Sequence, residues 1–186
     1  FSEKQGHLAD LAREAAAGGA KLLIAVGGDG TVNEVVNGIA GVDDVELAVV
    51  HRGTGGDFVR TFGVPHELEG ALEVARDGAT REIDLGRATF HTWAGPEGQA
   101  WFANAASAGM SGAVAKRVNE TGKALGGKVS YAWSTFAVFA RWRNAQITVT
   151  VDGEMRTGAM YDVIVANGRF LGGGMMMLPE AEPDDG

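Results

Sequence analysis

The first 80 residues alternate between amphipathic stretches and short apolar runs. Apolar residues fall on one helical face within residues 3–17, and Gly18-Gly19 ends that pattern. Residues 20–26 form a continuous apolar run closed by glycine, as expected for a strand covered on both faces. The pattern then predicts a helical stripe over 32–39, a buried strand over 45–50, a short helix within 55–63 and a longer helix over 66–78. This order predicts a parallel sheet with right-handed crossovers.

Beyond Thr80 the apolar runs alternate with polar residues and are separated by turn signals, which is typical of antiparallel β structure. The turn signals are Gly95-Pro96 and Asp152-Gly153. Two helical stretches, roughly 111–121 and 128–142, interrupt the strands. The sequence therefore predicts an α/β fold in two domains with a boundary near Asp84. Residues 1–84 form a parallel, three-layer domain, and residues 85–186 form an antiparallel β-rich domain.

Composition and charge narrow the chemistry. Glycine supplies 29 of the 186 residues, about twice the usual share, and is concentrated in loops. A net charge of -8 argues against a nucleic-acid partner, because phosphate backbones require clustered Lys and Arg. The absence of cysteine excludes disulfides and thiolate metal sites. Without a basic leader or a long apolar run, we expect a cytoplasmic protein, and the loop-like ends suggest a fragment.

The stretch IAVGGDGTVNEVVNG, residues 24–38, places glycines between a buried strand and a helix. In that position Gly27-Gly28-Asp29-Gly30 would present backbone N–H groups and the positive end of the helix dipole at the carboxyl edge of the sheet. Such a turn can bind phosphate, and glycine permits close approach of the ligand.

Thr31 and Glu34 have a second interpretation. They satisfy the S/T-x-x-E capping box, so their side chains could do no more than satisfy donors at the helix end. Asn33 stands where a dinucleotide fingerprint requires its last glycine, and no Gly-Lys-Ser/Thr occurs, so the loop is neither a Rossmann nor a Walker A motif. Both roles stay open for Thr31 and Glu34.

A second loop makes the phosphate interpretation stronger. Residues 53–57, Gly-Thr-Gly-Gly-Asp, again follow a buried strand and open a helix, and Asp57 lies about one βαβ unit after Asp29. Successive parallel strands end at the same edge of a sheet, where open α/β sheets bind ligands. We therefore expect the two loops to meet and to supply N–H groups, hydroxyls and carboxylates for a polyphosphate and Mg²⁺.

Five segments, taken in order, resemble the catalytic domain of the diacylglycerol/sphingosine-type lipid kinases. The segments are GGDGTVNEVVNG (27–38), RGTGGDFVRTFG (52–63), IDLG (83–86), FANAASAG (102–109) and NGRFLGGGMMMLPEAEPDDG (167–186). The resemblance spans nearly the whole chain. GGDGT alone is shared with NAD kinases, whereas the continuation NEVVNG and the glycine triplet favour the lipid-kinase branch.

The resemblance implies transfer of the γ-phosphoryl of ATP to a lipid hydroxyl, with Mg²⁺, at a membrane surface. It implies roles for residues of both loops and of the chain's end. The nucleotide-binding residues would be Gly27, Gly28, Gly30, Thr31, Glu34, Thr54 and Gly55. Asp29, Asp57 and Asp84 would form an acidic network around the metal and the reacting groups, and Asp185 matches an acid associated with a Mg²⁺ site. A homodimer is compatible with this interpretation.

The sequence departs from the family pattern at three places. Gly56 replaces an Asn of the second loop, the first strand with its nucleotide loop is missing before Phe1, and the family's catalytic Glu lies downstream of Gly186. We therefore expect both domains to be incomplete and the chain to be inactive alone.

Several alternatives stay open. Diacylglycerol is the leading acceptor, with sphingoid bases or other hydroxylated lipids as alternatives. A NAD kinase-type phosphotransferase and a non-catalytic nucleotide-binding module are the rival functions. The apolar stretch 129–142 is too short to span a bilayer and could be a core helix or a membrane contact. The four histidines have no metal-ligand spacing.

Overall fold

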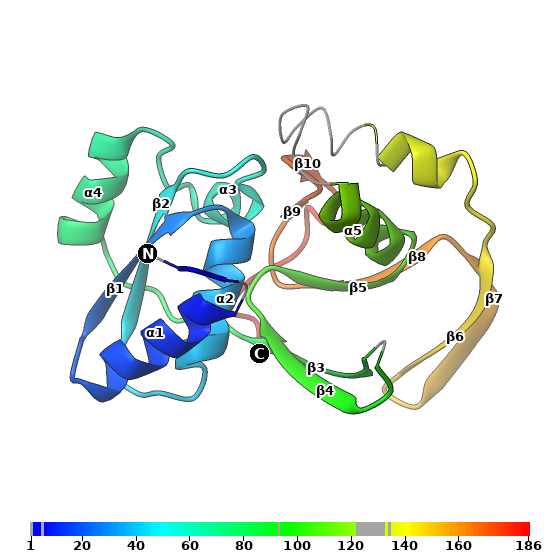
Figure 1. The fold of residues 1–186 in the computed structure, drawn as a ribbon, viewed down its shortest axis with the longest axis horizontal. Coiled ribbons are helices and arrows are strands. Elements are labelled where there is room, and N and C mark those ends of the chain that lie inside the picture. The colour runs from blue at the N-terminus through cyan, green and yellow to red at the C-terminus, as the bar shows by residue number, and fades with distance from the viewer. Residues whose placement is uncertain (1, 5, 93, 122–132, 134) are drawn as a thin grey trace. The chain divides into compact units, whose positions relative to one another are not determined.

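The chain consists of two compact units. The computed structural model describes it except for residues 1, 5, 93, 122–132 and 134 (Figure 1). The first unit comprises Phe1–Ala105 together with Ala166–Gly186, and the second comprises Ala106–Val165. The first unit is thus discontinuous in sequence, because the last residues of the chain return to it.

The first unit opens with alternating helices and strands (Figure 1). These are α1 (His7–Ala17), β1 (Leu22–Gly27), α2 (Asp29–Ile39), β2 (Glu46–His51), α3 (Asp57–Phe62) and α4 (Leu68–Asp77). The two strands are parallel, with Leu22 opposite Glu46 and Gly27 opposite His51. The predicted order of elements and the parallel pairing are confirmed.

Small residues allow α1 and α2 to pack closely. A Cβ atom on Gly38 would clash with the carbonyl oxygen of Ala9 and lie 2.8 Å from the Cβ of Ala12. Ala12, Ala25 and Val35 then form a buried cluster between α1, β1 and α2. Because well-packed interiors leave few voids, a side chain at position 38 would force the two helices apart.

The two strands differ in how well they are covered. Val49 and Val50 are neighbours in β2 whose side chains point to opposite faces, and both are buried. The α2 residues Val32 and Val36 cover the Val49 face, and α4 packs against β2. In β1, by contrast, Val26 is 61% exposed. Leu22 and Ile24, on the same face as Val26, are also exposed, so the prediction that the first strand is covered on both faces is wrong.

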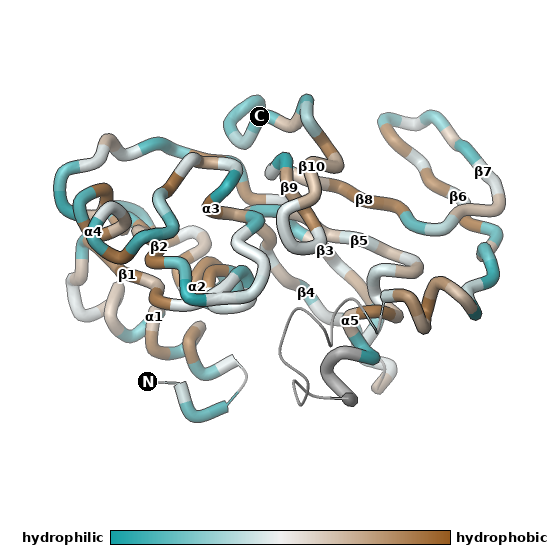
Figure 2. The backbone as a smooth tube through the Cα atoms, turned by 90° about the horizontal axis from the view of Figure 1, so that it is seen from above, coloured by the Kyte–Doolittle hydropathy of each residue, from teal (hydrophilic) through white to brown (hydrophobic). Residues whose placement is uncertain are grey.

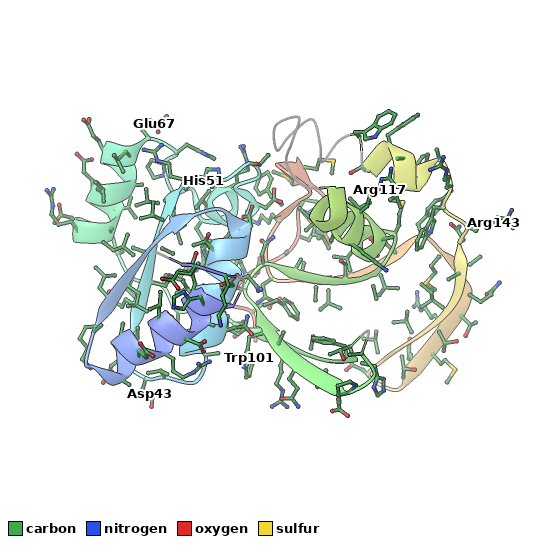
Figure 3. The ribbon with its side chains drawn as sticks, viewed as in Figure 1. Asp43, His51, Glu67, Trp101, Arg117 and Arg143 are labelled. Atoms are coloured by element: carbon green, nitrogen blue, oxygen red, sulfur yellow. The ribbon has the colours of Figure 1, made fainter. Side chains whose placement is uncertain are left out.

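A two-stranded antiparallel ladder follows, formed by β3 (Gly86–His91) and β4 (Glu97–Phe102). The side-chain amide of Asn37 in α2 holds it in place, because Nδ2 donates to the Trp101 carbonyl at 2.9 Å and Oδ1 accepts from the Trp101 N–H at 2.8 Å. Figure 3 labels Trp101 on β4. The short strands β9 (Phe170–Leu171) and β10 (Met175–Met176) form a hairpin in the returning segment.

The second unit contains β5 (Ala105–Gly109), α5 (Met110–Thr121), β6 (Ala145–Val151), β7 (Glu154–Met160) and β8 (Asp162–Ala166). The first residue of β5, Ala105, and the last residue of β8, Ala166, belong to the first unit. β6 and β7 are antiparallel and joined through Asp152 and Gly153, which have φ angles of 50° and 85°. Positive φ at both central residues is typical of a type I′ hairpin turn, so the predicted turn is confirmed. β5 pairs with β8.

The antiparallel β character predicted beyond Thr80 is confirmed by these ladders. The predicted helix over 128–142 lies partly outside the described residues, and 133 and 135–139 are helical. Among the described helices none has the length and apolar character needed to cross a membrane. The boundary near Asp84 stays a prediction, and the compact units place β3, β4 and the segment 166–186 with the first unit.

Candidate functional site

The first glycine loop is a single-residue connection between strand and helix. β1 ends at Gly27, α2 begins at Asp29, and Gly28 between them is extended, with φ −103° and ψ −170°. Gly30 and Thr31 therefore lie in the first turn of α2, where backbone N–H groups have no intrahelical acceptor. The prediction that glycine-rich backbone meets a helix N-terminus at the strand's carboxyl end is confirmed.

The capping-box interpretation of Thr31 and Glu34 is wrong. The helix begins before Thr31, and its N-cap residue Gly28 has no side-chain hydrogen bond. Glu34 instead accepts a hydrogen bond from the backbone N–H of Leu8 at 3.3 Å and so stabilises the first turn of α1. Thr31 packs beneath Gly27, where a Cβ atom would lie 2.7 Å from the Thr31 Cβ.

The two glycine loops lie against each other. A Cβ atom on Gly28 would lie 3.0 Å from the Cα of Gly53, and one on Gly53 would lie 3.1 Å from the Gly28 nitrogen. The N–H of Arg52 donates to the Gly27 carbonyl at 2.7 Å. Glycine at both positions therefore lets the two loops approach backbone to backbone, as the sequence predicts. Thr54, the hydroxyl-bearing residue of the second loop, is exposed.

Asp29 connects the first loop to the helix that follows the second. Its carboxylate accepts hydrogen bonds from the backbone N–H groups of Gly56, at 2.9 Å, and Phe58, at 3.0 Å. Gly56 is the N-cap of α3, so Asp29 satisfies donors of the α3 N-terminus from outside that helix. The interaction fixes the second loop relative to the first.

Asp57 connects the second loop to the β9–β10 hairpin. Its side chain is buried, and its carboxylate accepts hydrogen bonds from the N–H of Gly173, at 3.0 Å, and of Gly174, at 2.6 Å. Gly172, Gly173 and Gly174 have φ angles of 74°, 91° and 102°, which non-glycine residues rarely adopt. Three glycines are therefore needed to fold this loop over the Asp57 carboxylate.

The three loops converge on Gly55. A Cβ atom there would lie 2.8 Å from Oδ2 of Asp29, 3.6 Å from Oδ2 of Asp57 and 3.6 Å from the Cα of Gly173. The guanidinium of Arg60 lies beside the same hairpin, because a Cβ on Gly174 would be 3.1 Å from its Nε atom. Arg60 is exposed and brings a positive charge to a cluster that otherwise contains carboxylates and backbone N–H groups.

A histidine pair explains the departure at Gly56. The rings of His51 and His66 meet edge to face, with centroids 4.9 Å apart. A Cβ on Gly56 would lie 2.9 Å from the His51 ring and 3.1 Å from the His66 ring, and Gly56 has a φ angle of 74°. Figure 3 labels His51 at the end of β2. Burial lowers the pKa of His51 below its ordinary value of 6.5 and His66 lowers it further, whereas Asp29 acts in the opposite direction.

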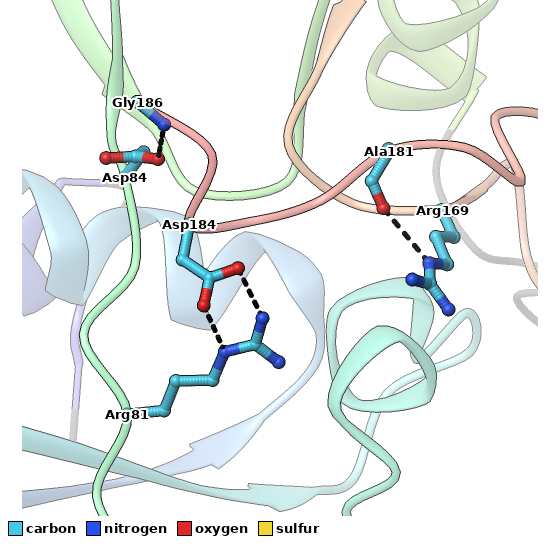
Figure 4. Close-up of polar contacts among 6 residues, drawn as sticks. All are labelled: Arg81, Asp84, Arg169, Ala181, Asp184 and Gly186. Atoms are coloured by element: carbon cyan, nitrogen blue, oxygen red, sulfur yellow. Dashed lines mark hydrogen bonds and ion pairs between the residues drawn. The ribbon is translucent and has the colours of Figure 1, made fainter.

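Asp84 lies beside the end of the chain (Figure 4). Its carboxylate accepts a hydrogen bond from the Gly186 N–H at 2.9 Å, and its backbone N–H donates to the Pro183 carbonyl at 2.7 Å. Arg81 forms a bidentate ion pair with Asp184, which lowers the pKa of that carboxyl. Arg169 donates to the Ala181 carbonyl. The structure thus brings Asp84 and the Asp184–Gly186 segment together, whereas Asp29 and Asp57 meet at Gly55.

The available carboxylates differ in their freedom to bind a metal. Those of Asp29 and Asp57 are already used by backbone donors, whereas Asp185 is exposed. The described residues contain no group of three His, Asp or Glu side chains placed to hold a metal ion. An ion held mainly by protein side chains therefore does not fit this arrangement, but a Mg²⁺ held by one carboxylate and ligand phosphates does.

Sequence reasoning missed several contributors. No sequence motif marks these residues. They are Arg60, the His51–His66 pair, the Arg81–Asp184 ion pair and Asn104, whose amide donates to the Phe170 carbonyl at 3.0 Å. A usable signal was the position of His51 at the last residue of a strand, since that residue must lie at the sheet edge where the loops meet.

Two family profiles together match most of the chain. The "Diacylglycerol kinase catalytic domain" matches residues 1–88, and the "YegS C-terminal NAD kinase beta sandwich-like domain" matches residues 104–186. The chain is 32% identical to a protein of Cronobacter sakazakii named "Probable lipid kinase YegS-like", over 98% of this chain and 60% of that protein. It is 31% identical to the Bacillus subtilis protein named "Diacylglycerol kinase", over 97% of this chain and 57% of that protein.

A solved structure shares the fold. The crystal structure of a diacylglycerol kinase from Bacillus anthracis aligns with a TM-score of 0.71 and 29% identity, over 100% of this chain and 57% of that one. The chain spans about 60% of the length of the curated relatives that it matches. Both halves thus match, in order, profiles and relatives of one kind. The chain belongs to the family of diacylglycerol kinases and YegS-like lipid kinases.

Proposed function

We propose that the protein containing this chain transfers the γ-phosphoryl group of ATP to the hydroxyl of a membrane lipid, with diacylglycerol as the leading acceptor. Family membership supports a lipid kinase. The choice of diacylglycerol follows the name of the Bacillus subtilis relative. Location in the cytoplasm, with contact at the membrane surface, and a homodimer belong to the same proposal.

The convergence of three glycine loops carries the proposal. Gly28, Gly53 and Gly173 bring three backbone segments together around Gly55, without side chains that would block a ligand. Phosphoryl transfer requires chiefly positioning and neutralisation of charge, so N–H groups at a helix N-terminus and a nearby cation suit it without a covalent nucleophile.

We assign the phosphates of ATP to the first turn of α2 and to the second loop. Gly27, Gly28, Gly30 and Thr31 would contact them from one side, and Thr54 and Gly55 from the other. Glu34 acts at a distance, because it holds α1 against α2 through Leu8. Arg60 adds the positive charge that the triphosphate requires.

Asp29 and Asp57 act as positioning residues in this proposal. Their hydrogen bonds to Gly56, Phe58, Gly173 and Gly174 set the relative placement of the three loops. Asp185, which is exposed, would hold Mg²⁺ together with phosphate oxygens, and Asp84 would hold the segment that carries Asp185. When bound, Mg²⁺ supplies neutralisation of phosphate charge.

The proposed function is tested by incubating the full-length protein with γ-labelled ATP and vesicles that contain diacylglycerol. We expect label in the lipid fraction, and loss of that label when diacylglycerol is omitted or Mg²⁺ is chelated. A parallel reaction with NAD tests the alternative acceptor.

Two results would contradict the proposal. Label that appears only in NADP would identify a NAD kinase. Binding of ATP without transfer to any acceptor would identify a nucleotide-binding module.

A variant of Asp185 tests the proposed Mg²⁺ site. Asp185→Asn should raise the Mg²⁺ concentration needed for half-maximal rate. Asp43→Asn, which changes another exposed aspartate, is the control and should not raise it.

A further inference from the structure

Exposed aromatic side chains gather on the second unit. Trp133, Phe136 and Phe139 recur every third residue along a helical segment and are 60%, 63% and 56% exposed. The Trp133 and Phe136 rings lie 6.2 Å apart, and Phe139 stacks on Tyr161 at 6.1 Å. The rings thus contact one another in pairs, and each keeps more than half of its surface open to solvent. The described aromatic side chains of the stretch 129–142 are therefore not those of a helix buried in the core.

Positive charge follows this aromatic row directly. Arg141 and Arg143 come just after Phe139, and both are exposed. Figure 2 shows the chain changing from hydrophobic to hydrophilic ahead of β6, and Figure 3 shows Arg143 projecting away from the ribbon. Asp162, the residue after Tyr161, accepts a hydrogen bond from the Ser111 N–H at 3.1 Å through Oδ2.

The two units have opposite charge. Residues 106–165 contain seven Lys and Arg against four Asp and Glu, a net charge of +3, although the whole chain carries -8. The remaining residues therefore carry a net charge of -11. The exposed rings thus lie on the second unit, whose net positive charge favours contact with an anionic surface.

We propose that Trp133, Phe136 and Phe139, together with Arg141 and Arg143, form a docking surface for an anionic lipid bilayer, hereafter the aromatic docking surface. This inference rests on the proposed lipid-kinase function, which requires the protein to reach a substrate held in a membrane. Tyr161 adds a ring with a polar hydroxyl, which suits the boundary between headgroups and acyl chains.

The chemistry favours a bilayer over a protein partner. Large rings can enter the headgroup region while adjacent arginines pair with anionic lipids, and such a surface lies in the interface without crossing it. The attraction should weaken with salt.

The test measures cosedimentation of the full-length protein with vesicles, in the absence of ATP. We expect binding to vesicles of phosphatidylcholine with phosphatidylglycerol, and about tenfold weaker binding to phosphatidylcholine alone. The double variant Trp133→Ser, Phe136→Ser should lower the partition coefficient about tenfold or more. The double variant Arg141→Ser, Arg143→Ser should remove the preference for anionic lipid.

Matched controls come from the first unit. Phe90→Ser changes an aromatic residue that is 45% exposed, and Arg13→Ser with Arg76→Ser removes two exposed arginines, so neither control should alter vesicle binding. Turnover of a short-chain diacylglycerol dissolved as monomers should be unchanged in the docking variants. This measurement separates the two proposals, because docking can hold even if no lipid is phosphorylated.

Three results would overturn the docking proposal. The first is equal vesicle binding by the parent protein and the aromatic double variant. The second is no vesicle binding by the parent together with a change of oligomeric state in the double variant, which would identify a second copy as the occupant. The third is no vesicle binding by the parent together with a loss of thermal stability in the double variant, which would show that another segment of the protein covers the rings.

Discussion

The carboxylate of Asp57 accepts a hydrogen bond of 2.6 Å from the backbone N–H of Gly174, a residue 117 positions further along the chain. Asp57 is 6% exposed, so its charge is removed from water and compensated by backbone donors of a distant hairpin. A buried carboxylate without such donors would be strongly unfavourable. The second glycine loop and the glycine triplet therefore depend on each other.

Replacing Asp57 by Asn should destabilise the full-length protein by about 2 kcal/mol, because an uncharged amide accepts weaker hydrogen bonds and its NH₂ group faces backbone donors. The free energy of unfolding in urea measures this loss. Asp43→Asn, at an exposed position, is the control and should change the stability little. Equal stability of the two variants would show that the hydrogen bonds to Gly173 and Gly174 contribute little.

A substitution at Gly30 should affect ATP binding and folding stability in opposite directions. A Cβ at this position meets nothing within 4 Å, so Gly30→Ala should stabilise the protein by about 0.5–1 kcal/mol as a helix residue. The same methyl group should obstruct a phosphate at the α2 N-terminus and weaken ATP binding about tenfold or more. Calorimetry of ATP binding and urea unfolding measure the two effects.

Gly112→Ala is the matched control for Gly30. It also lies in the first turn of a helix, with nothing within 4 Å of its Cβ position. We expect a similar gain in stability and no change in ATP binding. Unchanged ATP binding in Gly30→Ala would place the nucleotide elsewhere.

Arg60 should contribute to binding of the triphosphate. Because its guanidinium lies beside Gly174, Arg60→Ala should raise the KM for ATP about tenfold, and Arg60→Lys should recover part of the loss. Arg52→Ala removes an exposed arginine that directly precedes the second loop in the sequence, and is the comparison. A larger effect at Arg52 than at Arg60 would reverse the assignment. Steady-state kinetics at varied ATP concentration distinguishes the two.

His51 should make the stability depend on pH. Its folded-state pKa lies below the ordinary value of 6.5, so at low pH the unfolded chain binds more protons at this site than the folded protein does. The free energy of unfolding should therefore fall as the pH decreases through 6.5 and level off below the folded pKa. His51→Gln should remove this part of the decrease.

Urea unfolding at about pH 8 and about pH 5 measures the difference. His91→Gln, at an exposed position in β3, makes the same chemical change in another element and is the control. If His51→Gln and the parent lose the same free energy of unfolding between these two pH values, His51 is not the source of the pH dependence.

Much of the fold could be predicted because local patterns determine it. The apolar spacing of residues 32–39 and the run at 45–50 correctly predicted α2 and β2, and the parallel order correctly placed the loops of Gly28 and Gly53 side by side. The Asp152-Gly153 turn was also predictable, because positive φ at two central residues has a clear sequence preference.

The remainder could not be predicted because it depends on contacts between distant segments. The spacing of Thr31 and Glu34 predicts a capping box, yet the Glu34 carboxylate accepts a hydrogen bond from the backbone N–H of Leu8 in another helix. The exposure of Val26 depends on which elements cover that face of the sheet, which the apolar run at 20–26 does not report. The meeting of Asp57 with Gly174 likewise requires knowledge of where residues 166–186 pack.

The return of residues 166–186 to the first unit has a consequence during synthesis on the ribosome. When β4 has emerged, α1 to α4 can already pack, but the donors for the Asp57 carboxylate have not yet been made. Contacts of such large sequence separation form late, because the intervening chain must first be closed into a loop. The nascent first unit should therefore remain open at its glycine loops until residues 166–186 have been synthesised, so that the proposed nucleotide site forms only after the β9–β10 hairpin has emerged.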